Sequence, residues 1–132
     1  MVSSGCTSEH SMEHAMSAYH PELPHGAGLI MISVEYFRFW INKHVCDDRF
    51  IDMAKFLGMS DAEKPEDFIT ALKALEDACK VGKLKMSDYG ITPDEFMKMA
   101  KNARATMGGL FNNDPAKTND EDIAGIYERS YR

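Results

Sequence analysis

The hydrophobic positions of this chain recur mostly at helical spacing, and the alternation typical of strands is nearly absent. A first helix is predicted from about Thr7 to Tyr19. Met12 and Met16 lie one turn apart in it and share a face with Tyr19. The segment 20–24 contains two prolines, and each disfavours helical backbone in the residue before it. The pattern therefore predicts a helix followed by a loop that reverses the chain.

The second predicted helix is the most hydrophobic part of the chain. It follows the segment His25–Gly28, continues to about Asn42, and is apolar on nearly all sides. A helix of this kind lies at the centre of a bundle. Its most apolar stretch has about 14 residues and contains Glu35 and Arg38, whereas a bilayer requires roughly 20 apolar residues. We therefore expect a buried helix and no membrane partner.

Four further helices are indicated by their ends. The third is predicted to stop before Gly58, and the fourth to begin near Pro65 and end at Gly82. Thr92 and Thr118 each begin a capping-box pattern that opens the fifth and sixth helices. The stripe predicted to be buried in the fourth helix consists of Phe68, Leu72, Leu75 and Cys79. The predicted fold class is all-α, a bundle of about six helices.

Length and charge narrow the class of protein further. A chain of 132 residues points to one domain, so residues 1–132 are predicted to form a single helical domain. The net charge of −6 argues against nucleic acid or an anionic membrane as the main partner. Cys6, Cys46 and Cys79 are odd in number and far apart, which indicates reduced thiols in a cytoplasmic protein. The N-terminus has no signal-peptide pattern.

Four of the five histidines fall within sixteen residues: His10, His14, His20 and His25. On a helix, His10 and His14 are one turn apart, and neutral imidazoles in that arrangement suit zinc or ferrous iron. His25 follows the reversal, where the positive end of a helix dipole disfavours imidazolium. Spacing alone leaves open that these are core and surface histidines without a ligand role. His44 lies in a polar run and is expected at the surface.

A short motif offers a second interpretation of the same residues. His10 to His14 read H-x-x-E-H, the motif of inverzincin peptidases, in which both histidines bind zinc and Glu13 activates water as a general base. Nothing downstream marks the third carboxylate ligand that such a site needs. This interpretation also leaves His25 without a role.

A longer segment, Ser8–Ile30 (SEHSMEHAMSAYHPELPHGAGLI), resembles the metal-binding segment of iron-containing (group III) alcohol dehydrogenases. That family carries one histidine, a second one turn later, a short loop, and a third histidine followed by glycine and an apolar helix. Three downstream segments also resemble the family, so the resemblance covers essentially the whole chain. They are Phe50–Gly58, Leu84–Thr92 and Asn119–Ile123.

The resemblance implies a fold and a set of site residues. The fold would be the C-terminal, metal-binding helical domain of the dehydroquinate synthase-like, iron alcohol dehydrogenase architecture. His10 and His25 would bind Fe2+ or Zn2+, and His14 would lie beside the nicotinamide and substrate in a positioning or proton-transfer role. The family's other two ligands, an aspartate and a histidine four residues later, come from upstream, and no such pair precedes His10. Residues 111–115 (FNNDP) depart from the family's T-N-P-R pattern.

The complete enzyme implied by this resemblance interconverts alcohols and aldehydes or ketones with NAD(P) through metal-polarised hydride transfer. A nucleotide-binding domain needs strands and a glycine-rich turn, but residues 26–28 supply only G-x-G. We therefore expect a C-terminal fragment that is inactive alone. Its expected partners are the missing domain, a small alcohol or aldehyde substrate in the complete enzyme, and a second copy of itself in a homo-oligomer. The alternative is a stand-alone helical metal-binding or interaction module without catalysis.

Overall fold

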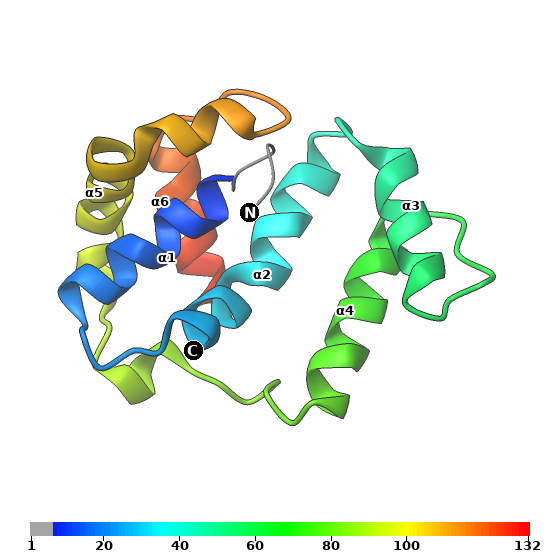
Figure 1. Ribbon diagram of the computed structural model, residues 1–132, viewed down its shortest axis with the longest axis horizontal. Helices are drawn as coiled ribbons and strands as arrows, with labels where there is room; N and C mark the ends of the chain where they lie inside the picture. The colour runs from blue at the N-terminus through cyan, green and yellow to red at the C-terminus, as the bar shows by residue number, and fades with distance from the viewer. Residues whose placement is uncertain (1–6) are drawn as a thin grey trace.

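The computed structural model describes residues 7–132, and Cys6 lies outside the described residues. Within this range there are six α-helices, three short 3-10 helices and no strand, which confirms the all-α prediction (Figure 1). None of these helices is both long enough and apolar enough to cross a membrane. The α-helices are α1 (Ser8–Tyr19), α2 (His25–Asn42), α3 (Asp47–Phe56), α4 (Glu66–Ala78), α5 (Phe96–Met107) and α6 (Asp120–Ser130). The 3-10 helices are η1 (Met86–Tyr89), η2 (Pro93–Glu95) and η3 (Gly108–Asn113).

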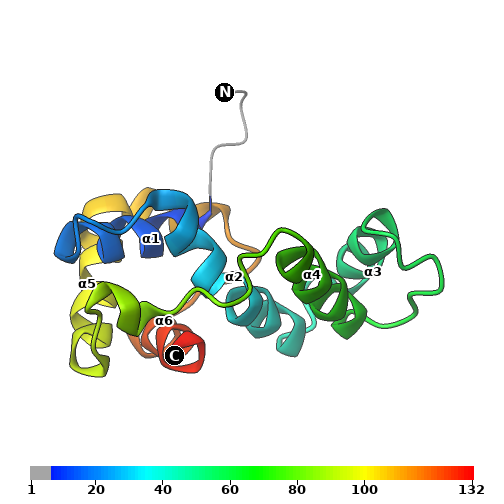
Figure 2. The ribbon, with the colours of Figure 1, turned by 90° about the horizontal axis from the view of Figure 1, so that it is seen from below.

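Helix α2 runs through the middle of the molecule, as its all-round hydrophobicity predicted. Helices α1 and α6 contact it from one side, and α4 contacts it from the other (Figures 1 and 2). Helix α5 lies over α1 and α6, whereas α3 is attached mainly through α4. The molecule therefore has a main body, built from α1, α2, α5 and α6, and an outlying pair of helices, α3 and α4.

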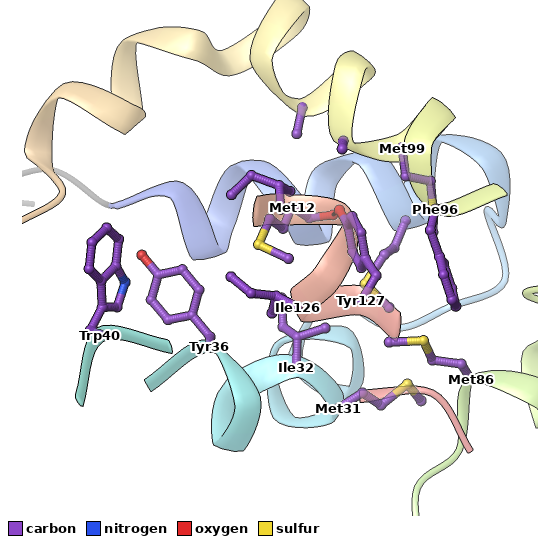
Figure 3. Close-up of a cluster of buried hydrophobic side chains, with 14 of the residues drawn as sticks. Met12, Met31, Ile32, Tyr36, Trp40, Met86, Phe96, Met99, Ile126 and Tyr127 are labelled. Carbon is purple, nitrogen blue, oxygen red and sulfur yellow. Dashed lines mark hydrogen bonds between the residues drawn. The ribbon is translucent and has the colours of Figure 1, made fainter. Parts of the chain in front are cut away.

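The main hydrophobic core lies in the main body (Figure 3). Met12, Ile32, Ile126 and Tyr127 are wholly buried there. The Tyr127 ring stacks on Phe96 with centroids 6.0 Å apart, and its hydroxyl donates a 2.6 Å hydrogen bond to the Met12 carbonyl oxygen. This bond ties α6 to α1, the helix that carries two of the candidate histidines. Flexible methionine side chains fill the irregular gaps: Met12, Met16, Met31, Met86 and Met99.

The fourth helix differs from the prediction at its end and on its buried face. It ends at Ala78 and not at Gly82, because Lys80 adopts left-handed backbone (φ 63°) and closes a Schellman motif. Leu75 is 45% exposed and Cys79 is exposed, so the predicted stripe is only half correct. Since α2 and α3 cover only part of α4, its buried face is narrower than the spacing suggested. That face consists of Phe68, Ile69 and Ala71.

The start of the sixth helix is shifted by one residue from the prediction. Asn119, and not Thr118, is the N-cap, and its side-chain oxygen accepts a 2.8 Å hydrogen bond from the Asp122 backbone N–H. Asp122 returns the bond to the Asn119 backbone N–H at 3.1 Å. The Thr118 hydroxyl instead accepts from the Arg104 guanidinium at 3.3 Å. Two adjacent residues with capping ability could not be ranked from sequence alone.

Candidate metal centre

The predicted histidine cluster forms where α1 meets the start of α2. His10 and His14 lie one turn apart on α1, and the loop that follows brings His25, the first residue of α2, beside both. The ring centroid of His25 is 5.5 Å from that of His10 and 5.4 Å from that of His14. We call these three residues the histidine cluster.

The histidine cluster opens toward solvent. His14 is exposed, His10 is half-buried, and the His25 side chain is 48% exposed. The three rings are therefore accessible from outside the domain, while the helix that carries two of them is buried behind. Such an arrangement can present imidazoles to a metal ion, a small molecule or another domain.

Beneath the cluster lies a buried carboxylate, that of Glu13. Its side chain is only 1% exposed, and Oε1 forms a hydrogen bond with Nδ1 of His25. The Ser17 hydroxyl donates to Glu13 Oε2 at 2.7 Å and to Oε1 at 3.1 Å. Gly28 of α2 passes directly over this group, so that a Cβ built there would lie 2.7 Å from Glu13 Cγ and 2.9 Å from Oε2. Helix α2 can approach the carboxylate this closely only because residue 28 has no side chain.

The burial of Glu13 contradicts the peptidase interpretation. Glu13 does lie on the cluster side of α1, as the spacing from His10 allowed. Its carboxylate, however, is closed off from solvent and is already bonded to His25 and Ser17. A general base must reach a substrate water, and this carboxylate has no open side from which to do so.

The electrostatic environment favours a neutral imidazole at His10. Burial lowers the pKa of His10 below its ordinary value, and the neighbouring rings of His25 and His14 lower it further. The Glu13 carboxylate acts in the opposite direction and offsets part of the effect. Neutral imidazole is the form that binds a metal ion, so the surroundings of His10 suit a ligand.

One residue before His10, the carboxyl group of Glu9 is also perturbed. Burial raises the pKa of Glu9 to about 7, and the Ser33 hydroxyl, which donates to its Oε1 at 3.0 Å, lowers it slightly. Near neutral pH this group therefore carries less negative charge than an ordinary carboxylate.

The remaining described histidines stand apart from the cluster. Nε2 of His20 hydrogen-bonds the two oxygens of Glu95 at 2.8 and 3.0 Å, which joins the end of α1 to the start of α5. His44 is on the surface, as predicted, with its side chain 69% exposed and Nδ1 3.1 Å from Asp47. The sequence grouped His20 with the others because it could not show which way the loop turned its ring.

The donor chemistry of the cluster fits a transition-metal site only in part. Among residues 7–132 no set of three or more His, Cys, Asp or Glu side chains converges closely enough to hold a metal ion. His10 and His25 offer two imidazoles, and His25 already has a carboxylate behind Nδ1, as metal-binding histidines in proteins commonly do. Imidazole pairs suit Fe2+ and Zn2+. The residues present therefore fit part of such a site.

A contact at the start of α1 that no local sequence pattern indicates is made by Asp114, in the segment that departs from the family pattern. Its Oδ1 accepts a 3.0 Å hydrogen bond from the Ser8 backbone N–H and a 3.3 Å hydrogen bond from the Tyr36 hydroxyl. The first turn of a helix has unpaired N–H groups and a positive partial charge, so this carboxylate stabilises the start of α1. Asp114 is 106 positions away from Ser8, and no local pattern links them.

The fold and the histidine cluster together define a class of protein: an all-α domain that presents three histidine rings at the junction of two helices. Residues 1–131 match the Fe-containing alcohol dehydrogenase family, C-terminal domain, and the chain belongs to this family. The fold class predicted from the sequence is thereby confirmed at the level of the family.

Individual relatives agree with this assignment. Long-chain primary alcohol dehydrogenase AdhA of Thermoanaerobacter ethanolicus is 30% identical over 127 residues, covering 92% of this chain and 31% of AdhA. The archaeal Red Sea brine pool alcohol dehydrogenase ADH/D1 superposes with a TM-score of 0.81 at 27% identity, over 94% of this chain and 32% of that one. A 1,3-propanediol oxidoreductase shares the fold at a TM-score of 0.78 and 22% identity, over 95% and 32%. The chain spans about a third of the length of these relatives.

Proposed function

We propose that this chain is the metal-binding, substrate-facing domain of an alcohol dehydrogenase that interconverts alcohols and aldehydes or ketones with NAD(P). The observation that carries the proposal is the convergence of three solvent-open histidine rings in a member of this family. Residues 1–132 act as one domain in it. The same rings would be unusual as core histidines, because two of them are exposed.

In this proposal His10 and His25 are the metal ligands contributed by the chain. The pKa of His10 is lowered by burial, which keeps its ring neutral. His25 has Nδ1 bonded to Glu13, so Nε2 is the nitrogen available on the open side. Both rings are carried on helices, α1 and α2, that pack against each other.

His14 is proposed to face the substrate and the nicotinamide. It is the exposed member of the cluster, and its ring meets that of His25 nearly edge-on, with an interplanar angle of 60°. From this position His14 can orient the alcohol substrate or transfer a proton to or from the hydroxyl oxygen of the alcohol. When bound, Fe2+ or Zn2+ supplies Lewis acidity toward that oxygen, and NAD(P)+ supplies the hydride acceptor.

The proposal requires a second domain over the histidine cluster. The described residues contain helices only, whereas a dinucleotide-binding fold is built on parallel strands. We propose that a nucleotide-binding domain covers the cluster, excludes water from it and contributes the remaining ligands. The 132-residue chain by itself is then expected to be inactive.

A chimeric enzyme tests this proposal. The chain replaces the corresponding third of Thermoanaerobacter ethanolicus AdhA, and NAD(P)-linked oxidation of a primary alcohol is followed by absorbance after loading with Fe2+ or Zn2+. We expect turnover, and a loss in His10→Ala and His25→Ala larger than the roughly 10–100-fold typical of changes behind a metal ligand. His44→Ala, on the surface, is the matched control. A folded, metal-loaded chimera that is inactive, or one as active without His25, contradicts the proposal.

The alternative of a non-catalytic interaction module is favoured by one observation, the exposed apolar side chains of α3, α4 and the loop between them. Phe56 is 91% exposed, and Leu57 and Leu75 are 42% and 45% exposed. Surfaces of this kind favour association with another chain. A dimer, however, is compatible with both functions, so the chimera assay and not the oligomeric state separates them.

A further inference from the structure

We propose that Glu13 is a positioning residue for His25: its buried carboxylate holds the Nδ1–H tautomer of the ring and turns Nε2 toward the open side of the cluster. This inference rests on the proposed function, in which His25 is a metal ligand. It assigns a role to a carboxylate that neither binds the metal nor touches the substrate in that function.

The directions of the hydrogen bonds at Glu13 determine which nitrogen of His25 carries the proton. A carboxylate can only accept, and the Ser17 hydroxyl already donates to both oxygens of Glu13. The bond between Glu13 Oε1 and Nδ1 of His25 therefore places the ring proton on Nδ1. The lone pair is left on Nε2, which is the form that a ligand at that nitrogen requires.

The Glu13 carboxylate is held in a fixed position by its surroundings. Glu13 has 0% exposed area, and Ser17, one turn later on the same helix, holds it in place. The Ser17 hydroxyl also lies 3.4 Å from the Leu23 carbonyl oxygen in the reversing loop. Gly28 closes the site from above, with no space for a Cβ. The orientation of His25 is thus set by α1, the loop and α2 together.

Burial of the Glu13 carboxylate has a free-energy cost that its hydrogen bonds must offset. A carboxylate without solvent is strongly unfavourable unless it is hydrogen-bonded and its charge is compensated. Glu13 receives hydrogen bonds from Ser17 and from the His25 ring, whose outer half is open. A carboxylate behind a ligating imidazole fixes its tautomer and ring orientation and raises its basicity. The buried carboxylate is therefore stabilised by two hydrogen-bond donors, one of which is the ring that it orients.

The competing explanation is that the Glu13–His25 bond only joins α1 to α2. Both explanations predict a loss of stability when Glu13 is changed. Only the positioning role predicts a change in the tautomer of His25 and in metal affinity at unchanged folding. The test therefore reads the ring nitrogens directly.

The first measurement is the ¹⁵N spectrum of the histidine rings of the 132-residue chain without metal, at about pH 8.5, where free imidazole is neutral. We expect His25 to carry its proton on Nδ1, opposite to the preference of histidine in water. Glu13→Gln should shift a substantial part of the population to the Nε2–H form. Wild-type His25 with its proton on Nε2 overturns the proposal without recourse to any variant.

The second measurement is calorimetric titration with Zn2+. We expect Glu13→Gln to weaken binding about 10–100-fold. The matched control is Glu9→Gln, since Glu9 lies on the same helix and also accepts a serine hydroxyl, that of Ser33, but does not bond a cluster histidine. Unchanged affinity in Glu13→Gln, or an equal loss in Glu9→Gln, overturns the positioning role.

A third variant covers the case in which Glu13→Gln does not fold. Ser17→Ala removes one clamp on the carboxylate and leaves the His25 bond in place, so it should weaken Zn2+ binding by several-fold and broaden the tautomer population. No change in either quantity contradicts the proposal. The failure of the proposed function is distinct, because there His25→Ala itself binds Zn2+ as well as the wild type does.

Discussion

At the scale of single residues, Gly28 lies against the buried Glu13 side chain and leaves no room for a Cβ. Gly28→Ala should destabilise the protein by about 1–3 kcal/mol, because the added Cβ would overlap Glu13 Cγ and Oε2 within a closed site. The free energy of unfolding in urea measures this change.

Gly26→Ala is the matched control for this prediction. It lies in the same first turn of α2, where an added Cβ meets nothing within 4 Å. Alanine at such a position should leave stability unchanged or raise it by up to about 1 kcal/mol. Equal effects of the two alanine substitutions would contradict the close approach.

The sequence identified the cluster residues but not what lies behind them. His10, His14 and His25 could be grouped because helical spacing and a proline-containing loop fix their separation within a short segment. The role of Glu13 could not be read in this way, since the same spacing serves an exposed base and a buried carboxylate. The contact of Asp114 with the start of α1 joins residues far apart in the chain and leaves no local signal.

At the scale of elements, the start of α5 is held by a capping box that also reaches α1. Glu95 Oε1 accepts from the Thr92 backbone N–H at 2.9 Å, and the same carboxylate bonds His20. Burial raises the pKa of Glu95, but the Thr92 hydrogen bond and His20 outweigh it, and the net shift is downward. A carboxyl group with a lowered folded-state pKa stabilises the fold above its unfolded pKa, and this contribution is lost as the pH falls through the folded value.

Glu95→Gln keeps an oxygen that can accept from the Thr92 N–H but removes the charge beside His20. It should therefore cost roughly 0.5–1.5 kcal/mol at pH 7 and less at about pH 3. Urea unfolding at both values measures the difference. Glu22→Gln, which removes an exposed carboxyl group of the reversing loop, is the matched control. A cost for Glu95→Gln that is equal at both pH values would contradict the role of its charge.

Capping signals predicted where helices begin better than hydrophobic stripes predicted which side chains are buried. The boxes at Thr92 and near Asn119 were found because they depend on residues three positions apart. The stripe of α4 failed at Leu75, because burial depends on which helices reach that part of α4. Partner helices are a property of the assembled fold and are not encoded in the stripe itself.

At the scale of the whole molecule, helices α3 and α4 contact the main body chiefly through α2. Phe50 of α3 is 4% exposed and its ring centroid lies 5.5 Å from that of Phe68, whereas Phe56, the last residue of α3, is 91% exposed. Phe56→Ser should change stability by no more than about 0.5 kcal/mol. Phe50→Ser should cost about 3–5 kcal/mol, because it removes a buried aromatic ring and leaves a cavity.

Thermal unfolding of the two serine variants, together with the wild type, measures this contrast. The two substitutions are chemically identical and lie in the same helix, so each is the control for the other. A large loss of stability in Phe56→Ser would show that the end of α3 is covered in solution.

The proposed function requires that His10 and His25 belong to one incomplete metal site. Calorimetric titration of the 132-residue chain with Zn2+ and Fe2+ tests this directly, with His10→Ala, His25→Ala and the surface variant His44→Ala. We expect weak binding that is abolished by either cluster substitution and unchanged in His44→Ala. Tight binding that survives the loss of His25 would contradict the proposed function and would indicate a self-contained site.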